Sequence, residues 1–291
     1  MYISVNGHLC DEKEAVVSVY DHGLLYGMGL FETFRTYKGM PFLLNEHLDR
    51  LRQGCRDLGI DFEPDAERIN RQISLLLDKN RLQDAYFRYT ITAGIEMLGL
   101  PSTNYSHPTE IMYIKQLPPL TGKLIEEGKS LQLLKLPRNT PEGLARYKSL
   151  HYMNTILGKK EMSQYPWARN AEGLMLTEEG YIAEGLVNNI FFILDGTCHT
   201  PSADTGILTG ITRRFVMNLA EQAGMNVCEG LYTWHDLLEA EEILITNSIQ
   251  GIVPIIRLYL PTGECHMVSA GDAGIMTKQL QKMYHQQTGS E

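Results

Sequence analysis

The stretch 181–214 holds the residues whose types and spacing best suit a chemical role. Glu184 follows the start of an apolar strand, and Asn189 opens a second, strongly apolar one. The segment 208–212, Leu-Thr-Gly-Ile-Thr, leads into a predicted helix. The first turn of a helix offers backbone N–H groups and the positive end of a dipole, which together suit a phosphate. A carboxylate beside such a helix start indicates a flat, phosphorylated ligand that contains nitrogen.

The same stretch is similar to the signature of a known family. Its motifs E-G-L-V-N-N-I-F and L-T-G-I-T-R resemble those of the class IV (fold type IV) pyridoxal-phosphate enzymes, which include branched-chain aminotransferases, D-amino acid aminotransferases and aminodeoxychorismate lyase. The signature is long and its spacing is constrained, so it is more specific than a lone glycine-rich loop. The sequence departs from it at Leu186 and Cys198, where we expect no chemistry.

The resemblance implies pyridoxal 5'-phosphate as the cofactor. This cofactor needs a lysine for covalent attachment, a carboxylate at its pyridine nitrogen and a clamp for its phosphate. Lys148 matches the lysine and Glu184 the carboxylate, while an arginine fork at Arg50 suits the phosphate. The full cofactor-binding set that the resemblance implies is Arg50, Lys148, Tyr152 (at the ring hydroxyl), Glu184, Asn189, Ile211 and Thr212.

Each of these residues also has an ordinary interpretation. A lysine at a predicted helix start, or a glutamate at a strand edge, is usually solvated. Arg50 could form an exposed i, i+4 pair with Glu46, worth about 0.2–0.5 kcal/mol. The spacing of Lys148 and Glu184 relative to the signature favours the catalytic roles. Lys159 and Lys160 fit the attachment role less well, because they lie at the far end of the predicted helix.

Substrate-binding residues are implied in the same way. Tyr26 matches a tyrosine of the family's pocket wall, and Arg88 matches an arginine that binds substrate carboxylates. Strand alternation places Arg88 on a polar face with Thr90, although an arginine in solvent at a sheet edge is the ordinary alternative. Asn247 and Ser248 end an apolar strand where the family's substrate loop lies, and many turns share this composition.

Three further motifs, F-E-T-F-R, R-N-T-P-E-G and K-S-L-H-Y-M-N, look most like aminodeoxychorismate lyase of the Bacillus type. The resemblance therefore implies a 4-amino-4-deoxychorismate lyase of folate biosynthesis, which eliminates pyruvate to give 4-aminobenzoate. Lys148 would be both nucleophile and general base. A class IV aminotransferase for D-amino acids or branched-chain amino acids would use the same residues with a keto acid as second substrate. A non-catalytic phosphate-binding protein is the other alternative, and it would show no visible cofactor band.

Hydrophobic spacing predicts the elements that position these residues. Strands are expected at 2–6, 30–37, 87–93, 111–114, 131–136, 173–177, 189–194 and 242–246. Two helices should bury the stripes Leu44, Leu48, Leu51, Cys55 and Leu58, and Ile69, Ile73, Leu76 and Leu77. Further helices are expected at 148–161, with Leu150, Met153 and Leu157 in the core, at 211–224 and at 273–285.

Two prolines and a glycine in the segment 117–122 interrupt regular structure and predict a linker. We therefore expect an N-terminal domain at 1–117, a linker at 118–122 and a C-terminal cofactor-binding domain at 123–291. The fold class is α/β with mixed α+β character. The resemblance implies the two-domain fold type IV arrangement, with a smaller N-terminal α/β domain and a larger C-terminal pseudo-barrel.

Composition limits the remaining possibilities. The chain has 291 residues, a net charge of -9 and no basic cluster, which argues against nucleic acid and anionic membranes as partners and for a small-molecule substrate. Its five scattered cysteines favour a reducing compartment, and its nine histidines lack metal-ligand spacing. We expect a cytoplasmic protein without a metal. The resemblance implies a homodimer with the active site near the subunit boundary.

Overall fold

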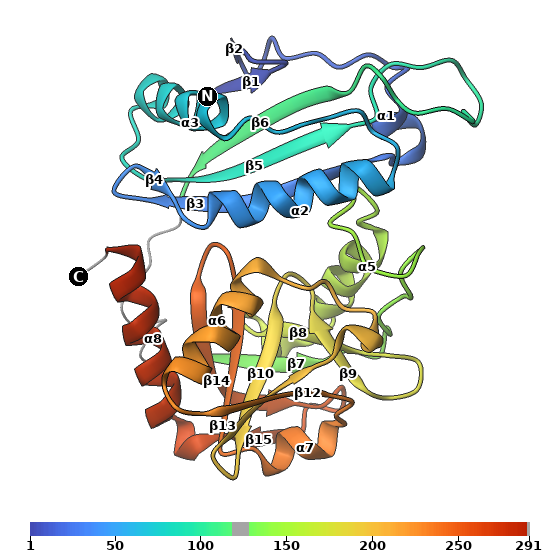
Figure 1. The fold of residues 1–291 in the computed structure, drawn as a ribbon. Helices are drawn as coiled ribbons and strands as arrows, with labels where there is room; N and C mark the ends of the chain where they lie inside the picture. Colours follow the sequence, from blue (N-terminus) through green and yellow to red (C-terminus); the bar gives the residue numbers. More distant parts are fainter. Residues whose placement is uncertain (118–127, 290–291) are drawn as a thin grey trace. The chain divides into compact units, whose positions relative to one another are not determined.

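The computed structural model describes residues 1–117 and 128–289, so the expected linker at 118–122 lies outside the described residues. The chain forms two compact units (Figure 1). Of the described residues, unit 1 contains 1–117, 147–151 and 288–289, and unit 2 contains 128–146 and 152–287.

Unit 1 is built on a six-stranded antiparallel sheet with the order β2-β1-β6-β5-β3-β4. Its strands are β1 (Tyr2–Val5), β2 (His8–Asp11), β3 (Gly29–Tyr37), β4 (Met40–Pro41), β5 (Ala85–Thr92) and β6 (Thr109–Gln116). A hairpin turn joins β3 to β4 through Lys38 and Gly39, whose φ angles of 51° and 80° suit a tight two-residue turn.

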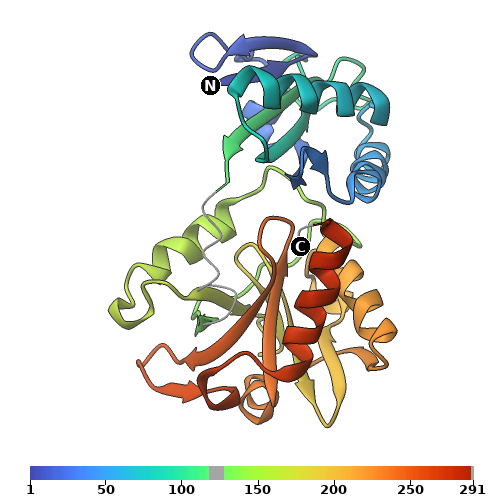
Figure 2. The same ribbon diagram turned by 90° about the vertical axis from the view of Figure 1, so that its left-hand side faces the viewer.

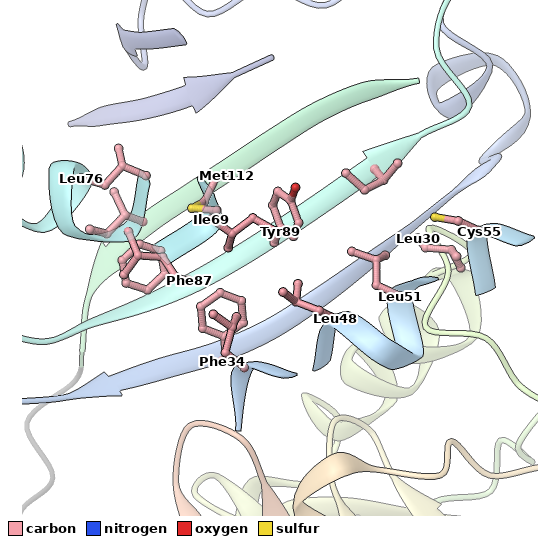
Figure 3. Close-up of a cluster of buried hydrophobic side chains, with 14 of the residues drawn as sticks. Leu30, Phe34, Leu48, Leu51, Cys55, Ile69, Leu76, Phe87, Tyr89 and Met112 are labelled. Atoms are coloured by element: carbon pink, nitrogen blue, oxygen red, sulfur yellow. The ribbon is translucent and has the colours of Figure 1, made fainter. Parts of the chain in front are cut away.

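The helices of unit 1 are α1 (His22–Tyr26), α2 (Leu44–Asp57) and α3 (Ala66–Asn80). The two predicted apolar stripes are confirmed, apart from Leu58, which caps α2 and is half-buried. In Figure 3, side chains of α2 and α3 meet Leu30 and Phe34 of β3 and Phe87 and Tyr89 of β5 in one core. Strand alternation turns residues 31 and 88 to the other face of this sheet.

The segment 147–151 is extended, which corrects the expectation that Lys148 begins a helix. The amide of Phe31 donates to the carbonyl of Lys148 at 2.9 Å, and the amide of Leu150 donates to the carbonyl of Gly29 at 3.1 Å. The strand β3 pairs with β4 only at its far end, so the edge at Gly29–Phe31 is open for this pairing. Helical spacing cannot reveal a strand edge that lies more than a hundred residues away in the sequence.

The helix that follows, α5 (Met153–Met162), also differs from its predicted core. Met153 and Leu157 are 75% and 46% exposed, whereas Gly158 is buried. A Cβ at position 158 would lie 2.5 Å from Cδ2 of Leu186, so α5 approaches its neighbour closely through a glycine. The prediction was wrong because it assigned the contact to the large apolar side chains.

Unit 2 is built on a nine-stranded mixed sheet with the order β12-β11-β10-β13-β14-β7-β8-β9, and β15 pairs with β14. Its strands are β7 (Lys129–Leu133), β8 (Glu172–Leu176), β9 (Ile182–Gly185), β10 (Asn189–Leu194), β11 (Thr197–Pro201), β12 (Asn226–Gly230), β13 (Glu242–Asn247), β14 (Gly251–Tyr259) and β15 (Cys265–Met267). The amide of Ile182 in β9 donates to the carbonyl of Tyr232, just past β12, at 2.7 Å. The two ends of the strand order therefore meet, and the expected pseudo-barrel is confirmed.

The other helices of unit 2 are α6 (Ile211–Gln222), α7 (Trp234–Glu239) and α8 (Ile275–Thr288), with short 3-10 turns at Pro166–Ala168, Ala203–Thr205 and Ser269–Gly271. In both ribbon views α8 lies along β13 and β14 (Figures 1 and 2), where Nε2 of Gln281 donates to the carbonyl of Ile252 at 3.2 Å. Within residues 1–117 and 128–289, no helix is long and apolar enough to cross a membrane.

Candidate active site

Glu184 lies on β9 with its carboxylate buried among donors. Oε1 accepts a hydrogen bond from Nε of Arg138 at 2.9 Å. Oε2 accepts from the amide of Leu208 at 3.1 Å and from Nδ2 of Asn189 at 3.3 Å. A carboxylate held by three donors from three separate segments has one orientation, which is what a specific contact to a ligand requires.

Burial raises the pKa of the Glu184 carboxyl, because a charge in a low-dielectric interior loses its hydration. The guanidinium groups of Arg138 and Arg146 and the Leu208 amide oppose this rise. Nε of Arg146 lies 3.9 Å from Oε1 of Glu184. The two guanidinium groups favour the ionised form of Glu184, and this form can accept a charge-assisted hydrogen bond from a protonated nitrogen.

The segment 138–146, which we predicted only as a loop, supplies both arginines. Nη1 of Arg138 donates to Oδ1 of Asn154 on α5 at 2.9 Å. Arg146 donates to the carbonyl oxygens of Asn139 and Gly206. Sequence reasoning missed these residues because no local pattern shows that a loop arginine pairs with a carboxylate 46 residues later.

The start of α6 lies beside this carboxylate. Gly210 is the N-cap, and no side chain caps the first turn. A Cβ at position 210 would lie 2.2 Å from Oδ1 of Asn189, so the approach requires glycine. Nδ2 of Asn189 also donates to the carbonyl of Leu208 at 2.8 Å. Asn189 is therefore hydrogen-bonded both to Glu184 and to the approach to α6. As a result, a carboxylate and an uncapped helix start lie next to each other.

A turn between β13 and β14 adds a hydroxyl group to the start of α6. Oγ of Ser248 lies 3.2 Å from Oγ1 of Thr212. Oδ1 of Asn247 accepts from the amides of Ile249 and Gln250 at 3.0 and 2.9 Å, which fixes the turn. Two hydroxyls beside an uncapped helix start suit a bound phosphate. The residues of unit 2 thus fit both the phosphate and the ring nitrogen of the expected ligand.

Arg50 takes part in a buried charged cluster of unit 1. Its Nε and Nη2 donate to the two oxygens of Glu32 at 2.8 and 2.7 Å. Nδ1 of His47 lies 2.6 Å from Oε2 of Glu32. Burial alone would raise the pKa of Glu32, but Arg50 and His47 hold it at about 2. Burial also lowers the pKa of His47, which favours its neutral form.

Lys148 and Arg88 both lie against the ring of Phe31 on the other face of the same sheet. Nζ of Lys148 is 4.8 Å from the ring centroid, and Cζ of Arg88 is 3.6 Å from it. Nε of Arg88 donates to Oγ1 of Thr90 at 3.3 Å. Arg88 is therefore not an arginine in open solvent at a sheet edge, and unit 1 brings it to the same aromatic ring as Lys148.

The two tyrosines of the predicted set have different surroundings. The hydroxyl of Tyr26 accepts from the amide of Gly99 at 3.1 Å, and its ring packs edge-on against His22. Tyr152 is the half-buried N-cap residue of α5 and uses no side-chain cap. Across the described part of the chain, no group of three His, Cys, Asp or Glu residues is placed to hold a metal ion.

Comparison with known proteins gives consistent matches along the chain. The family model "Amino-transferase class IV" matches residues 29–258. The chain is 42% identical over 258 residues to the aminodeoxychorismate lyase of Bacillus subtilis (88% of this chain, 86% of that protein). It is 36% identical over 284 residues to a putative branched-chain-amino-acid aminotransferase of Methanocaldococcus jannaschii (98% and 95%).

A solved structure matches as well. The 4-amino-4-deoxychorismate lyase of Pseudomonas aeruginosa has a TM-score of 0.83 and 28% identity to this chain. The match covers 98% of this chain and 98% of that one. The two units therefore have the fold type IV architecture.

The buried cluster in unit 1 predicts how stability depends on pH. The pKa of Glu32 is lowered from 4.5 to about 2 in the folded protein. The ionised carboxylate therefore stabilises the fold fully above pH 4.5, and this stabilisation is lost as the pH falls from 4.5 to about 2. Its size is on the order of 3 kcal/mol. Denaturant unfolding between about pH 5 and about pH 2.5 should show a smaller loss of stability for Glu32→Gln than for the wild type.

The exposed Glu67 provides a matched control, since its side chain is 91% exposed and pairs with Arg71 at 3.7 Å. Glu67→Gln should keep the wild-type pH profile. If Glu32→Gln also kept that profile, the cluster would not hold the Glu32 carboxyl ionised in the folded state.

Proposed function

The chain belongs to the class IV aminotransferase family, and from this premise we propose that it is a pyridoxal-phosphate-dependent 4-amino-4-deoxychorismate lyase. The observation that carries the proposal is the 42% identity to the lyase of Bacillus subtilis over 88% of this chain. The buried Glu184 beside the uncapped start of α6 supports the cofactor part of the proposal.

Residues of unit 2 would hold the cofactor at two points. Glu184, oriented by Arg138 and Asn189, would accept a hydrogen bond from the protonated pyridine nitrogen. The backbone N–H groups of Ile211 and Thr212, with the hydroxyls of Thr212 and Ser248, would bind the phosphate. Pyridoxal phosphate, when bound, supplies an electron sink for charge that develops next to the substrate amine.

Residues of unit 1 complete the proposed set. Arg50 would bind the phosphate, and its orientation is set by the two hydrogen bonds to Glu32. Lys148 would carry the cofactor covalently. The carbonyl of Lys148 is hydrogen-bonded to the amide of Phe31, so the sheet holds the backbone of this lysine in place. The proposed roles of Tyr152 at the ring hydroxyl and of Asn247 and Tyr26 at the substrate are retained.

Lys148 would perform the proton transfer of the reaction. In the proposed reaction the amine of Lys148 would accept the proton from the ring carbon that bears the amine of the substrate. The C–O bond to the enolpyruvyl group then breaks, and the leaving group takes up one proton to become pyruvate. The ring becomes aromatic, so the elimination is favourable and the protein mainly orients the reactants.

A class IV aminotransferase is the second candidate, favoured by the 36% identity to the archaeal relative over 98% of this chain. Pyruvate release from aminodeoxychorismate by the purified protein, measured beside amino transfer from D-alanine and branched-chain amino acids, distinguishes the two. We expect pyruvate and 4-aminobenzoate in equal amounts. Amino transfer without pyruvate release would replace the lyase with the aminotransferase.

We further propose a homodimer, which an apolar surface of unit 1 supports. Segments 16–26 and 95–100 lie together, because the amide of Glu96 donates to the carbonyl of Tyr20 at 3.3 Å. Their exposed apolar residues are Val16, Val17, Val19, Tyr20, Leu24, Leu25, Tyr26, Ile95, Met97, Leu98 and Leu100. An exposed apolar patch of this kind usually marks a protein interface.

Placing a charge in this surface should separate the subunits. Leu98 is 67% exposed, and Leu98→Glu should lower the mass measured by light scattering from that of a dimer to that of a monomer. Leu75 is 53% exposed on α3, outside the patch, so Leu75→Glu should leave the dimer intact. A wild-type protein with the mass of one chain would refute the proposal directly.

Lys148→Ala should remove the covalent attachment of the cofactor and lower turnover by about a thousandfold or more, because the attachment and the proton transfer use one amine. Visible absorbance and borohydride reduction followed by peptide mapping measure the attachment. Lys159→Ala on α5 is the matched control and should behave like the wild type. A reduced adduct on Lys159 or Lys160 would contradict the assignment.

Arg88→Ala tests the recognition of a substrate with two carboxylates. Losing a charge-assisted contact should lower kcat/KM roughly ten- to a hundredfold. Cofactor occupancy should not change, since Arg88 stacks on Phe31 and has no proposed contact with phosphate. Arg71→Ala, on the exposed side of α3 with a 66% exposed side chain, should have no effect. Loss of cofactor from Arg88→Ala, or normal turnover, would exclude the substrate role.

A further inference from the structure

In unit 2, polar side chains join the turn beside Glu184 and Asn189 to the turn that carries Ser248, and apart from Asn247 none of them has yet been given a role. The turn 185–188 separates Glu184 from Asn189, and the turn 247–250 carries Ser248. The connecting side chains form a continuous chain, which we call the polar brace. Its members, in order, are Asn188, Glu172, Lys129, Gln250 and Asn247.

An ion pair forms the centre of the polar brace. Nζ of Lys129, at the start of β7, donates to Oε1 of Glu172, at the start of β8, at 2.6 Å. The two side chains are only 13% and 20% exposed. Nζ of Lys129 also lies 3.5 Å from Oε1 of Gln250, which in turn accepts from Nδ2 of Asn247 at 3.1 Å. One ammonium group thus connects the strand starts to the turn that carries Ser248.

The other end of the brace holds the turn beside Glu184. Oε2 of Glu172 accepts from Nδ2 of Asn188 at 3.4 Å. The carbonyl of Asn188 accepts from the amide of Gly185 at 2.9 Å. A Cβ at position 185 would lie only 2.0 Å from Oδ1 of Asn188, so the turn is closed tightly against the glycine. The orientation of Asn188 therefore affects the chain on both sides of the turn, at Glu184 and at Asn189.

Stability alone does not account for such a pair. Removing two charges from water costs several kcal/mol per ion, and apolar residues of similar size often stabilise a fold as well as a buried ion pair does. An ion pair with directional hydrogen bonds does, however, fix the separation of the segments that it joins. Of the two turns joined here, one is flanked by Glu184 and Asn189 and the other carries Ser248.

We propose that Lys129 and Glu172 are positioning residues for the cofactor site. Through the polar brace they fix the position of the Ser248 turn relative to the turn beside Glu184. They thereby also fix the position of the Ser248 hydroxyl, which lies beside that of Thr212. This inference rests on the proposed function, because it assumes that the phosphate binds at Thr212 and Ser248. Lys129 and Glu172 themselves contact neither cofactor nor substrate in this assignment.

The test is the dissociation constant for pyridoxal phosphate, measured by absorbance as the cofactor is released from the holoenzyme on dilution. Lys129→Met should raise this constant about tenfold, and Lys129→Arg should keep most of the affinity. Gln250→Ala breaks the same connection without leaving a buried charge, so it should weaken binding even if Lys129→Met folds poorly. In a Ser248→Ala background, Lys129→Met should add less than about twofold, because the turn would have no hydroxyl left to position.

Arg68→Met supplies the matched control. Arg68 and Glu110 form a partly buried pair in unit 1 at 2.8 Å, with side chains 34% and 11% exposed. This variant should lower the unfolding midpoint and leave the cofactor affinity unchanged. Unchanged affinity in Lys129→Met and Gln250→Ala, or equal effects of Lys129→Met with and without Ser248, would overturn the inference alone. A wild-type protein that binds no pyridoxal phosphate would overturn the proposed function as well.

Discussion

The burial of the Glu184 carboxylate is the constraint on which much of unit 2 depends. An unpaired carboxylate in the interior would be protonated or would destabilise the fold by several kcal/mol. Donors from three segments hydrogen-bond to the Glu184 carboxylate: Arg138 from a loop, Asn189 from the next strand and the Leu208 amide from the approach to α6. The 138–146 loop and the approach to α6 are therefore both hydrogen-bonded to one buried side chain.

Unit 1 contains a second buried carboxylate with a different electrostatic outcome. Glu32 is held by Arg50 through two parallel hydrogen bonds and by His47. Those partners outweigh burial, and the pKa of Glu32 is about 2. At Glu184 burial prevails, and the pKa is raised. The difference follows from geometry, since Arg50 holds both oxygens of Glu32, whereas Arg138 donates to only one oxygen of Glu184.

The groups that would hold the cofactor are common to the family, whereas the groups that would bind the rest of the substrate differ between its members. A carboxylate for a ring nitrogen, a helix start for phosphate and a lysine serve any reaction that removes a proton next to an amine. The distinction between lyase and aminotransferase concerns the groups that recognise the rest of the substrate. Arg88, stacked on Phe31 beside Lys148, is the residue to which we assign this recognition in the proposed function. The proposed activity therefore depends on recognition more than on the cofactor chemistry.

The sequence by itself determined the strands β1, β3, β5, β6, β7, β8, β10 and β13, the helices α2, α3, α6 and α8, and the motif around Glu184, because strand alternation and helical stripes record burial locally. It did not predict several other strands, among them β14 in the middle of the larger sheet. It also placed Asn189 and the start of α6 within one signature. Only the tertiary structure decided that Lys148 lies on an extended segment paired with β3, that α5 packs through Gly158, and that Arg50 faces Glu32. Arg138, Arg146 and the Lys129–Glu172 pair were likewise invisible in the sequence. Each of these features depends on a contact between segments that are far apart in the sequence. Such contacts produce no repeating pattern of apolar residues from which they could be predicted.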